Sequence, residues 1–425
     1  MKTLQEELES RGLLYQSSNQ ELFEKFEQGW HNFYCGFDPT ADSLHLWNFI
    51  GFMVAIHIMR RWNNYTALTW GATGMIGDPG GKDSERSFLS QDLLNSHQWA
   101  IQGQMTEMLA NLQAFSGEDF QYNFVNNKDF YENMSYLDFL REVGKFITVN
   151  TMIAKDSVKK RIEDPKQSIS YTEFSYMLLQ GYDFAHMYHT QNMTLQIGWQ
   201  DQWWNLVTGT EIIRKKYDWD SYVMTWPLIT DASGKKFGKS EWNALWLDKN
   251  KTTPYALYQY FMNTTDDDIE RYLKMLTLIE VEDIQQHVKD HVQAPEQRKG
   301  QKLLAYSVVE IIHGSDEADF AQSVTQFMFT KNKTDILNES SADTLVKFQQ
   351  AIGGYMYKGE NLFETMVSSG LATSNSDARK ALTSWAISIN EQKISDPHFD
   401  IQSAFLHNDA LLIQKGKKNL KLILK

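Results

Sequence analysis

The chain has 425 residues, a length that predicts two or three domains, each able to bury a core of its own. Its 42% hydrophobic and 22% charged residues are typical of a soluble globular protein. A net charge of −13 argues against non-specific nucleic-acid binding over the whole surface, because phosphate contacts need clustered lysine and arginine. A local basic patch remains, since residues 410–425 contain lysines and no acid.

The sequence shows no sign of export or of a membrane span. Cys35 is the only cysteine, which excludes an internal disulfide and fits a reducing compartment. Residues 1–11 have a charged amphipathic helix pattern rather than a signal peptide, and no apolar run approaches the roughly 20 residues that cross a bilayer. These features predict a cytoplasmic protein that does not enter a membrane.

The first part of the chain predicts a strand, a turn and a helix that form an anion site. The apolar segment 33–36 ends in a turn that carries Asp38, and a helix starts near Ser43. Backbone N–H groups in the first turn of a helix have no partner within the helix, so they can bind an anion. We therefore expect a phosphate at this turn, with amphipathic helices in residues 1–30 packed outside the strand.

A second unit of the same kind indicates a parallel sheet. Residues 66–70 read as a strand that runs into the glycine-rich turn 71–82, where glycine lets the backbone approach a ligand closely. Candidate strands follow at 125–130, 195–197 and 223–229, with helices between them. The alternation predicts an α/β fold with a Rossmann-like parallel sheet and ligands at its carboxyl edge.

Two predicted helices carry polar groups that need an explanation. In 171–188, Tyr176, Gln180 and Asp183 share one face, and the apolar residues between them favour the polar wall of a buried pocket over a surface stripe. The helix at 152–162 carries a basic run, which is most simply a solvated face. That run comprises Lys155, Lys159, Lys160 and Arg161.

Four stretches resemble the tyrosyl-tRNA synthetases, a family of class I aminoacyl-tRNA synthetases. Residues 34–48 resemble the first family signature, with His45 as its first histidine and Asn48 in place of its second, and residues 236–240 resemble the second signature. Residues 198–205 match a family stretch between them. Residues 371–382, with the basic tail, resemble a small S4-type RNA-binding domain. The likeness covers nearly the whole chain.

The resemblance implies a division into a Rossmann-like catalytic domain, an α-helical tRNA (anticodon-side) domain, a linker and a small α+β S4-like RNA-binding domain. Their expected bounds are 1–245, 246–345, 346–360 and 361–425. In agreement, the strand and helix alternation ends after residue 247, where amphipathic helix patterns begin. The resemblance also suggests a second interpretation of the basic run, as a contact with the tRNA acceptor stem.

The reaction implied by the resemblance joins L-tyrosine and ATP to tyrosyl-adenylate and diphosphate, and then passes the tyrosyl group to tRNA(Tyr). The carboxylate of tyrosine attacks the α-phosphorus in line, so positioning and charge stabilisation supply most of the catalysis. Mg²⁺ would accompany ATP, and no His or Cys cluster predicts a protein-bound metal. The resemblance further implies a homodimer.

Site residues are implied position by position. Those at the reacting phosphates are His45, Asn48, Lys236, Lys239 and Ser240. Those that bind tyrosine are Tyr34, Asp78, Tyr176, Gln180, Asp183 and Gln202, with Tyr34 and Asp183 at the phenolic hydroxyl. Those that bind ATP are Gly36, Asp38, Thr40, His45, Asp201 and Lys239, and those that bind RNA are Arg379, Lys380, Lys415, Lys417 and Lys418. If His45 stood alone, it would most simply be a helix cap or a core residue, and Lys236 and Lys239 would most simply lie in a solvated turn. Because both family signatures occur in the expected order, we favour a role for these residues in an active site.

Tryptophan stands at many positions where the family has glycine. These positions are Trp47, Trp62, Trp70, Trp199, Trp204, Trp226, Trp242 and Trp385, with Trp30 and Trp219 as plausible additions. Glycine serves where the backbone approaches a ligand or takes a positive φ, and an indole satisfies neither need. Taken literally, Trp47 would occupy the adenine position, while Trp70, Trp199 and Trp204 would crowd the tyrosine and ribose pockets.

Two explanations compete for these tryptophans. The first is that the chain is a catalytically inactive, RNA-binding relative whose pocket is filled. In such a relative the polar site residues would also have been replaced, but in this sequence they are all present. Alternatively, UGA codons, which some bacterial lineages translate as glycine and other codes as tryptophan, have been read with the wrong table. The pattern favours this hypothesis, in which the natural protein has glycine and is active. A third reading, an enzyme that uses tyrosyl-adenylate for another purpose, conflicts with the tRNA-binding portions.

Overall fold

The computed structural model describes residues 2–76, 90–163, 169–229, 245–416 and 419–425. They fold into two compact units, which are described separately. The first unit contains residues 1–252 and 261–315, and the second contains 253–260 and 316–425. Each unit has its own sheet and its own apolar core. The helical region at 246–345 is thus divided between the two units.

The first unit is built on a six-stranded sheet with the order β1-β6-β5-β2-β3-β4. Its strands are β1 (Gln16–Ser17), β2 (Asn32–Phe37), β3 (Asn64–Thr69), β4 (Tyr122–Asn126), β5 (Met193–Trp199) and β6 (Tyr222–Trp226). All pair in parallel except β1, which is antiparallel to β6. The sheet grows in opposite directions from β2 and β5, and this switch point leaves a crevice at their carboxyl ends. The predicted α/β fold is confirmed.

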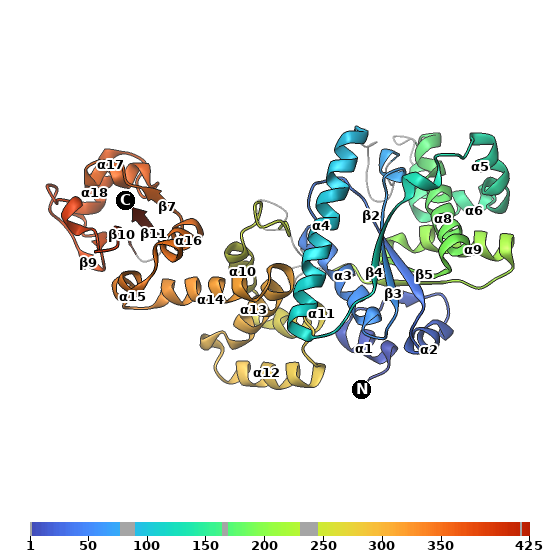
Figure 1. Cartoon of the computed structure of the whole chain (residues 1–425), viewed down its shortest axis with the longest axis horizontal. Coiled ribbons are helices and arrows are strands. Elements are labelled where there is room, and N and C mark those ends of the chain that lie inside the picture. Colours follow the sequence, from blue (N-terminus) through green and yellow to red (C-terminus); the bar gives the residue numbers. More distant parts are fainter. Residues whose placement is uncertain (1, 77–89, 164–168, 230–244, 417–418) are drawn as a thin grey trace. The chain divides into compact units, whose positions relative to one another are not determined.

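Helices cover both faces of this sheet. In Figure 1, α3 and α4 lie on one side of it and α8 and α9 on the other. The α-helices are α1 (Leu4–Arg11), α2 (Glu21–Glu27), α3 (Leu46–Met59), α4 (Gln91–Ser116), α5 (Tyr136–Glu142), α6 (Val149–Ile153), α7 (Asp156–Glu163), α8 (Tyr171–Gln191), α9 (Trp203–Tyr217), α11 (Asp266–Leu276), α12 (Val281–Gln293) and α13 (Lys299–His313). The 3-10 helices are η1 (Thr73–Met75), η2 (Asn127–Phe130), η3 (Gly144–Phe146), η4 (Gln200–Gln202) and η5 (Pro295–Gln297).

Helix α8 begins and ends where its sequence signals lie. The hydroxyl of Ser170 accepts a hydrogen bond from the N–H of Glu173, whose carboxylate accepts one from the N–H of Ser170. This reciprocal capping box fixes the first turn. Asn192 ends the helix in the left-handed conformation, with φ of +51°. The helix predicted at 171–188 is therefore confirmed.

Three predicted boundaries differ from the structure, the first being the strand predicted at 223–229, which is β6 and ends at Trp226. The strand predicted at 125–130 ends at Asn126 and continues as η2, because the Asn126 side chain accepts a hydrogen bond from the N–H of Lys128 and turns the chain. The helix expected near Ser43 begins three residues later, at Leu46. The Ser43 hydroxyl instead accepts a hydrogen bond from the N–H of Asp248.

The second unit contains a five-stranded sheet with the order β7-β11-β10-β8-β9. Its elements are α14 (Ser315–Phe329), α15 (Lys333–Glu339), α16 (Ala342–Ile352), β7 (Gly354–Met356), α17 (Leu362–Ser368), α18 (Asn375–Thr383), β8 (Ile387–Ile389), β9 (Gln392–Lys393), η6 (Gln402–Ala404), β10 (Ala410–Lys415) and β11 (Asn419–Leu424), and α10 (Pro254–Met262) begins in this unit and ends in the first. No α-helix in the described parts has the length and apolar character needed to cross a bilayer.

Residues 346–360, predicted as a linker, are instead part of the second unit's fold. They contain the end of α16 and the whole of β7, which pairs in parallel with β11. Phe348 is buried in an apolar cluster with Leu345 and Leu422. A buried aromatic residue and a paired strand hold this segment in place, so it does not act as a free connection.

Candidate active site

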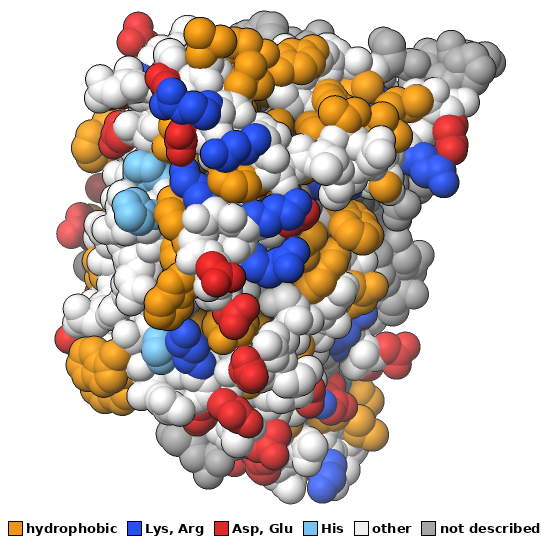
Figure 2. Space-filling model, turned by 90° about the vertical axis from the view of Figure 1, so that its right-hand side faces the viewer, with side chains coloured by type: hydrophobic (Ala, Val, Ile, Leu, Met, Phe, Trp, Pro, Cys, Tyr) orange, Lys and Arg blue, Asp and Glu red, His pale blue; other side chains and the backbone are white. Residues whose placement is uncertain are grey.

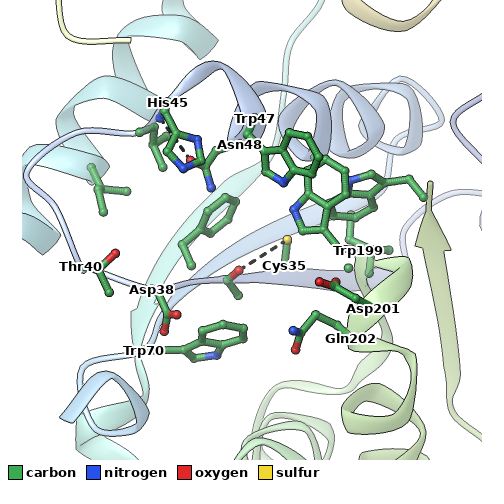
Figure 3. Close-up of a pocket in the computed structure, with 18 of the residues that line it drawn as sticks. Cys35, Asp38, Thr40, His45, Trp47, Asn48, Trp70, Trp199, Asp201 and Gln202 are labelled. Carbon is green, nitrogen blue, oxygen red and sulfur yellow. Dashed lines mark hydrogen bonds between the residues drawn. The ribbon is translucent and has the colours of Figure 1, made fainter. Parts of the chain in front are cut away.

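A cavity of about 370 Å³ opens at the switch point of the first sheet (Figure 3). It lies at the carboxyl ends of β2 and β5, beside the first turn of α3. Eight predicted site residues line it, namely Gly36, Asp38, Thr40, His45, Asn48, Gln180, Asp201 and Gln202. Residues from distant parts of the sequence therefore meet where a parallel sheet binds its ligands.

The first turn of α3 presents His45 and Asn48 to this cavity. His45 is the N-cap residue, and its backbone N–H donates to Oδ1 of Asn48 at 3.1 Å. Because the cap uses the amide oxygen, the Nδ2 hydrogens of Asn48 remain as donors. Backbone hydrogen bonds of 2.8 Å join residues 44–46 to 245–247 and fix the turn. The geometry suits donation of hydrogen bonds to an anion.

Seven residues singled out in the sequence lie outside the described residues, namely Asp78, Lys236, Lys239, Ser240, Trp242, Lys417 and Lys418. The described segments on either side of 230–244 both reach the cavity region. Before this gap Trp226 lines the cavity, and after it Trp246 lines the cavity beside His45.

Three predicted tyrosine-binding residues lie deeper than the cavity. Tyr34, Tyr176 and Asp183 are at most 1% exposed, and none of them lines the cavity, although Gln180 on the same face of α8 does. Trp70 belongs to the same buried cluster as Tyr34 and also lines the cavity. The predicted phenol-binding residues are thus buried and do not border the open space of the cavity.

Asp183 is held by two residues that sequence reasoning missed. Nδ2 of Asn127 donates to Oδ2 of Asp183 at 2.9 Å, and the hydroxyl of Tyr131 lies 2.8 Å from Oδ1. Oδ1 of Asn127 accepts from the N–H of Ala72 at 2.8 Å, which fixes the orientation of the amide. Burial raises the pKa of Asp183 to about 8, although both hydrogen bonds oppose that rise. The sequence signal that could have indicated Asn127 is its position directly after β4, because polar residues at the carboxyl edge of a parallel sheet often contact the ligand.

Four of the tryptophans fill part of the cavity. The rings of Trp47 and Trp199 stack with centroids 4.5 Å apart, and Trp226 lies 5.2 Å from Trp199. Trp70 lies so close to Gly36 that no Cβ would fit there. Trp204, in contrast, is half-exposed and does not line the cavity, so the prediction that it crowds a pocket is wrong.

Three other tryptophans have a backbone conformation that L side chains rarely adopt. The φ angles of Trp30, Trp62 and Trp385 are +65°, +60° and +58°. A bulky residue at positive φ is an outlier, whereas glycine adopts this conformation without steric cost. All three side chains are exposed, so no buried contact explains why tryptophan is used.

The helix predicted at 152–162 is broken into the end of α6, a turn and α7, so that Lys155 lies in the turn and the other three residues of the basic run lie on α7. Lys155 is buried, and its Nζ donates to Oγ1 of Thr208 at 2.6 Å. Arg161 is also buried and makes two hydrogen bonds to the carboxylate of Glu173, at 2.9 and 3.1 Å. The predicted solvated face is therefore wrong for Lys155 and Arg161, which anchor the fold, and holds for the exposed Lys159.

In the second unit, three of the predicted RNA-binding residues lie on or beside α18. Arg379 and Lys380 are exposed on that helix, and the Arg379 guanidinium lies 5.2 Å from the centre of the Phe363 ring. Lys415 on β10 pairs with Asp377 at 3.0 Å. Arg379 and Lys380 form no ion pair with the described residues, so their charges can meet a phosphate backbone, while the charge of Lys415 is already neutralised.

Two family models match this chain. Residues 27–330 match the class I tRNA synthetases for tryptophan and tyrosine, and residues 351–423 match the SYY-like C-terminal domain of tyrosine–tRNA ligases. The first match covers well over half of the chain and includes the cavity. The chain therefore belongs to the class I tRNA synthetases.

Individual relatives narrow the family. The chain is 40% identical to the tyrosine–tRNA ligase of Streptococcus suis over 423 residues, which is 98% of this chain and 99% of that one. It is 41% identical to the ligase of Streptococcus gordonii over 418 residues, 97% of each chain. A truncated mitochondrial tyrosyl-tRNA synthetase from Aspergillus nidulans superposes with a TM-score of 0.70 at 28% identity, over 77% of this chain and 95% of that one. Within class I, the chain is a member of the tyrosine–tRNA ligases, which confirms the resemblance.

Proposed function

We propose that the natural protein activates L-tyrosine with Mg²⁺-bound ATP and transfers the tyrosyl group to tRNA(Tyr) in the cytoplasm. The observation that carries this proposal is the meeting of eight predicted site residues in one cavity at the switch point. Similarity to tyrosine–tRNA ligases over almost the whole chain supports it. The catalytic, helical and C-terminal domains expected from the sequence, 1–245, 246–345 and 361–425, belong to the same proposal, while the structure divides residues 246–345 between its two compact units.

The cavity residues suit the chemistry of adenylate formation. His45 and Asn48 would donate hydrogen bonds to phosphate oxygens at the first turn of α3, while Asp38 and Asp201 would face the nucleotide. Lys236 and Lys239 would stabilise the charge that develops on the leaving diphosphate. The described residues Trp226 and Trp246, on either side of the segment that carries these lysines, line the cavity, which supports this role. Tyr34 and Asp183 would bind the phenolic hydroxyl, with Asp78, Tyr176, Gln180 and Gln202 around the rest of tyrosine.

Tyrosine-dependent exchange of labelled pyrophosphate into ATP, followed by charging of tRNA(Tyr), tests the proposal in the protein made by its own organism. We expect both activities. A protein that binds tRNA but gives no exchange would be the non-catalytic relative. Exchange without charging of tRNA would instead indicate an enzyme that spends the adenylate on another acceptor.

We also propose that two copies associate through the end of the first unit that carries α5 to α8. Apolar side chains gather on the face shown in Figure 2. The exposed apolar residues of α5 to α8 are Tyr136, Leu137, Leu140, Val149, Ile153, Ile162 and Tyr171. The hydroxyls of Tyr136 and Tyr171 are 3.0 Å apart, so α5 and the start of α8 form one surface. Exposed apolar groups in such number mark an interaction surface.

Leu137→Asp tests the homodimer. Leu137 is 75% exposed, so the change should not disturb folding, but a carboxylate buried in an apolar interface would weaken association by at least about tenfold. Sedimentation velocity should show a dimer for the parent chain and a monomer for the variant. Val292→Asp, at a 69% exposed position on α12, is the matched control and should stay dimeric. A dimer that survives Leu137→Asp would exclude this surface.

The positive φ angles support the hypothesis that tryptophan replaces glycine. For Trp385, which is exposed and has no stacking partner among the described rings, we expect Trp385→Gly to stabilise the chain by about 1 kcal/mol in urea unfolding. Trp385→Ala is the control, because alanine keeps the Cβ that makes this conformation costly. If Trp385→Gly and Trp385→Ala were equally stable, the positive φ at position 385 would not be evidence that glycine is the natural residue.

A further inference from the structure

The hydroxyl of Tyr131 lies between two acceptors. It is 2.8 Å from Oδ1 of Asp183 and 2.9 Å from the carbonyl oxygen of Leu179. Tyr131 follows η2, and its ring packs edge-on against the Tyr182 ring with centroids 5.4 Å apart. The hydroxyl is therefore held in place by packing on α8 as well as by its hydrogen bonds.

A hydroxyl has one hydrogen, so it cannot donate to both acceptors at once. If Asp183 is ionised, the charge-assisted bond is the stronger, and Tyr131 donates to Oδ1. If Asp183 is protonated, its own hydrogen can go to the Tyr131 oxygen, and Tyr131 then donates to Leu179. The two protonation states of Asp183 thus correspond to two directions of the same hydrogen bond.

Asn127 determines which carboxylate oxygen of Asp183 can carry the proton. Its amide is fixed by Ala72 and donates to Oδ2, so Oδ2 is always an acceptor. The hydrogen of a protonated Asp183 is therefore confined to Oδ1, where Tyr131 stands. The hydroxyl of Tyr34, which is fully buried, has no hydrogen-bond partner among the described residues. A buried donor and acceptor without a partner indicates a polar ligand atom nearby.

We propose that Tyr131 is a positioning residue for tyrosine specificity: by donating to Oδ1, it favours the ionised form of Asp183 and orients that carboxylate to accept the phenolic hydroxyl of the substrate. The inference rests on the proposed function. It adds Tyr131 to the residues that determine specificity, although Tyr131 would not touch the substrate. It also links the binding of tyrosine to the loss of a proton from Asp183. Phenylalanine, which has no hydroxyl to donate, would not gain from that ionisation.

The groups around Asp183 show why a hydrogen-bond donor is needed to favour its ionised form. The titratable side chains that face it are Tyr34 from β2, Tyr131 after η2, and Tyr182 on the same helix. These are neutral at physiological pH, since burial raises the pKa of each. Burial likewise raises the pKa of Asp183, and Asn127 and Tyr131 hold that pKa down. Loss of the Tyr131 donor should raise it further.

The first test measures the ionisation of Asp183 without any activity. The carboxyl carbon of Asp183 is followed by NMR from pH 5 to pH 10 in the aspartate-labelled chain and assigned by its absence in Asp183→Asn. We expect Tyr131→Phe to move the midpoint upward by about one pH unit, the equivalent of one lost hydrogen bond to a charged group. Tyr182→Phe, which removes a hydroxyl bonded to His186 instead, should leave the midpoint in place. An unchanged midpoint in Tyr131→Phe would overturn the proposal.

The second test measures specificity in the chain that carries glycine at the tryptophan positions. At pH 7, Tyr131→Phe should weaken tyrosine binding, and hence the preference for tyrosine over phenylalanine, by about tenfold. The loss should shrink as the pH rises above the midpoint. A loss that is independent of pH would indicate a merely structural role and overturn the proposal. Absence of exchange in the parent would count against the proposed function, while the NMR titration would still decide the role of Tyr131.

Discussion

Replacement of the tryptophans at glycine positions by glycine is expected to raise tyrosine-dependent pyrophosphate exchange by about 10³-fold or more, from near background in the chain as printed. Trp47, Trp70, Trp199 and Trp226 take up space in the cavity where substrates must bind. A displacement of about 1 Å in bound geometry already costs roughly 10²-fold, and indoles in the site displace substrates by more than that. A normal exchange rate in the printed chain would falsify this prediction.

The matched control restores glycine only at Trp30, Trp62 and Trp385. These side chains are exposed and lie outside the cavity, so this variant should gain stability without gaining activity. The complementary variant, with glycine only at the four cavity positions, should gain activity. If both variants stayed inactive while the fully restored chain was active, the remaining positions, including Trp242, would carry the effect.

The codons of the gene decide the origin of these residues. UGA at positions 47, 70, 199, 204 and 242, with UGG at 203 and 246, would mean that glycine is the natural residue. Trp203 and Trp246 match tryptophans of the family, so they serve as internal references. UGG throughout would mean that the cavity is truly filled, and the non-catalytic RNA-binding interpretation would then be preferred.

The sequence predicts those features that depend on local signals or on the topology of a parallel sheet. The glycine-rich turns and alternating elements predict the sheet, and the sheet brings His45, Gln180 and Asp201 together although they are far apart in the chain. The helix predicted at 171–188 is likewise found, and the structure shows that a capping box at Ser170 fixes its start. In each case the signal lies within a few residues, or follows from strand order alone.

The features that could not be predicted depend on packing between elements. Nothing in the local sequence tells that Tyr131 meets Asp183, because the contact depends on where η2 lies against α8. The same holds for the basic run, where charge and spacing indicate a solvated helix. The break between α6 and α7 turns Lys155 inward to Thr208, a result that only the three-dimensional structure shows.

Arg161→Ala is expected to lower the free energy of unfolding by about 3–5 kcal/mol, because it leaves the buried carboxylate of Glu173 without its partner. Urea unfolding measures the loss. Lys159→Ala is the matched control on the same helix, since Lys159 is 57% exposed and its pair with Glu163 spans 3.8 Å; it should change stability by about 0.5 kcal/mol or less. If the basic run served only to contact tRNA, both variants would unfold like the parent and would share a loss of tRNA affinity.

The pH dependence separates an electrostatic cause from lost packing. Hydrogen bonds from Arg161 lower the pKa of Glu173 below its ordinary 4.5, so the pair stabilises the fold above that pH and ceases to do so as the pH falls through the lower, folded-state pKa. The gap between the parent and Arg161→Ala should therefore narrow below pH 4.5. In the Arg161→Met variant, the Glu173 carboxylate is buried without its partner, and the added change Glu173→Gln removes that charge. The glutamine amide oxygen can still accept the hydrogen bond from the N–H of Ser170. The double variant should therefore recover much of the stability that Arg161→Met loses. If the double variant does not recover stability, the Arg161 guanidinium stabilises the fold chiefly through its packing contacts and not through its charge.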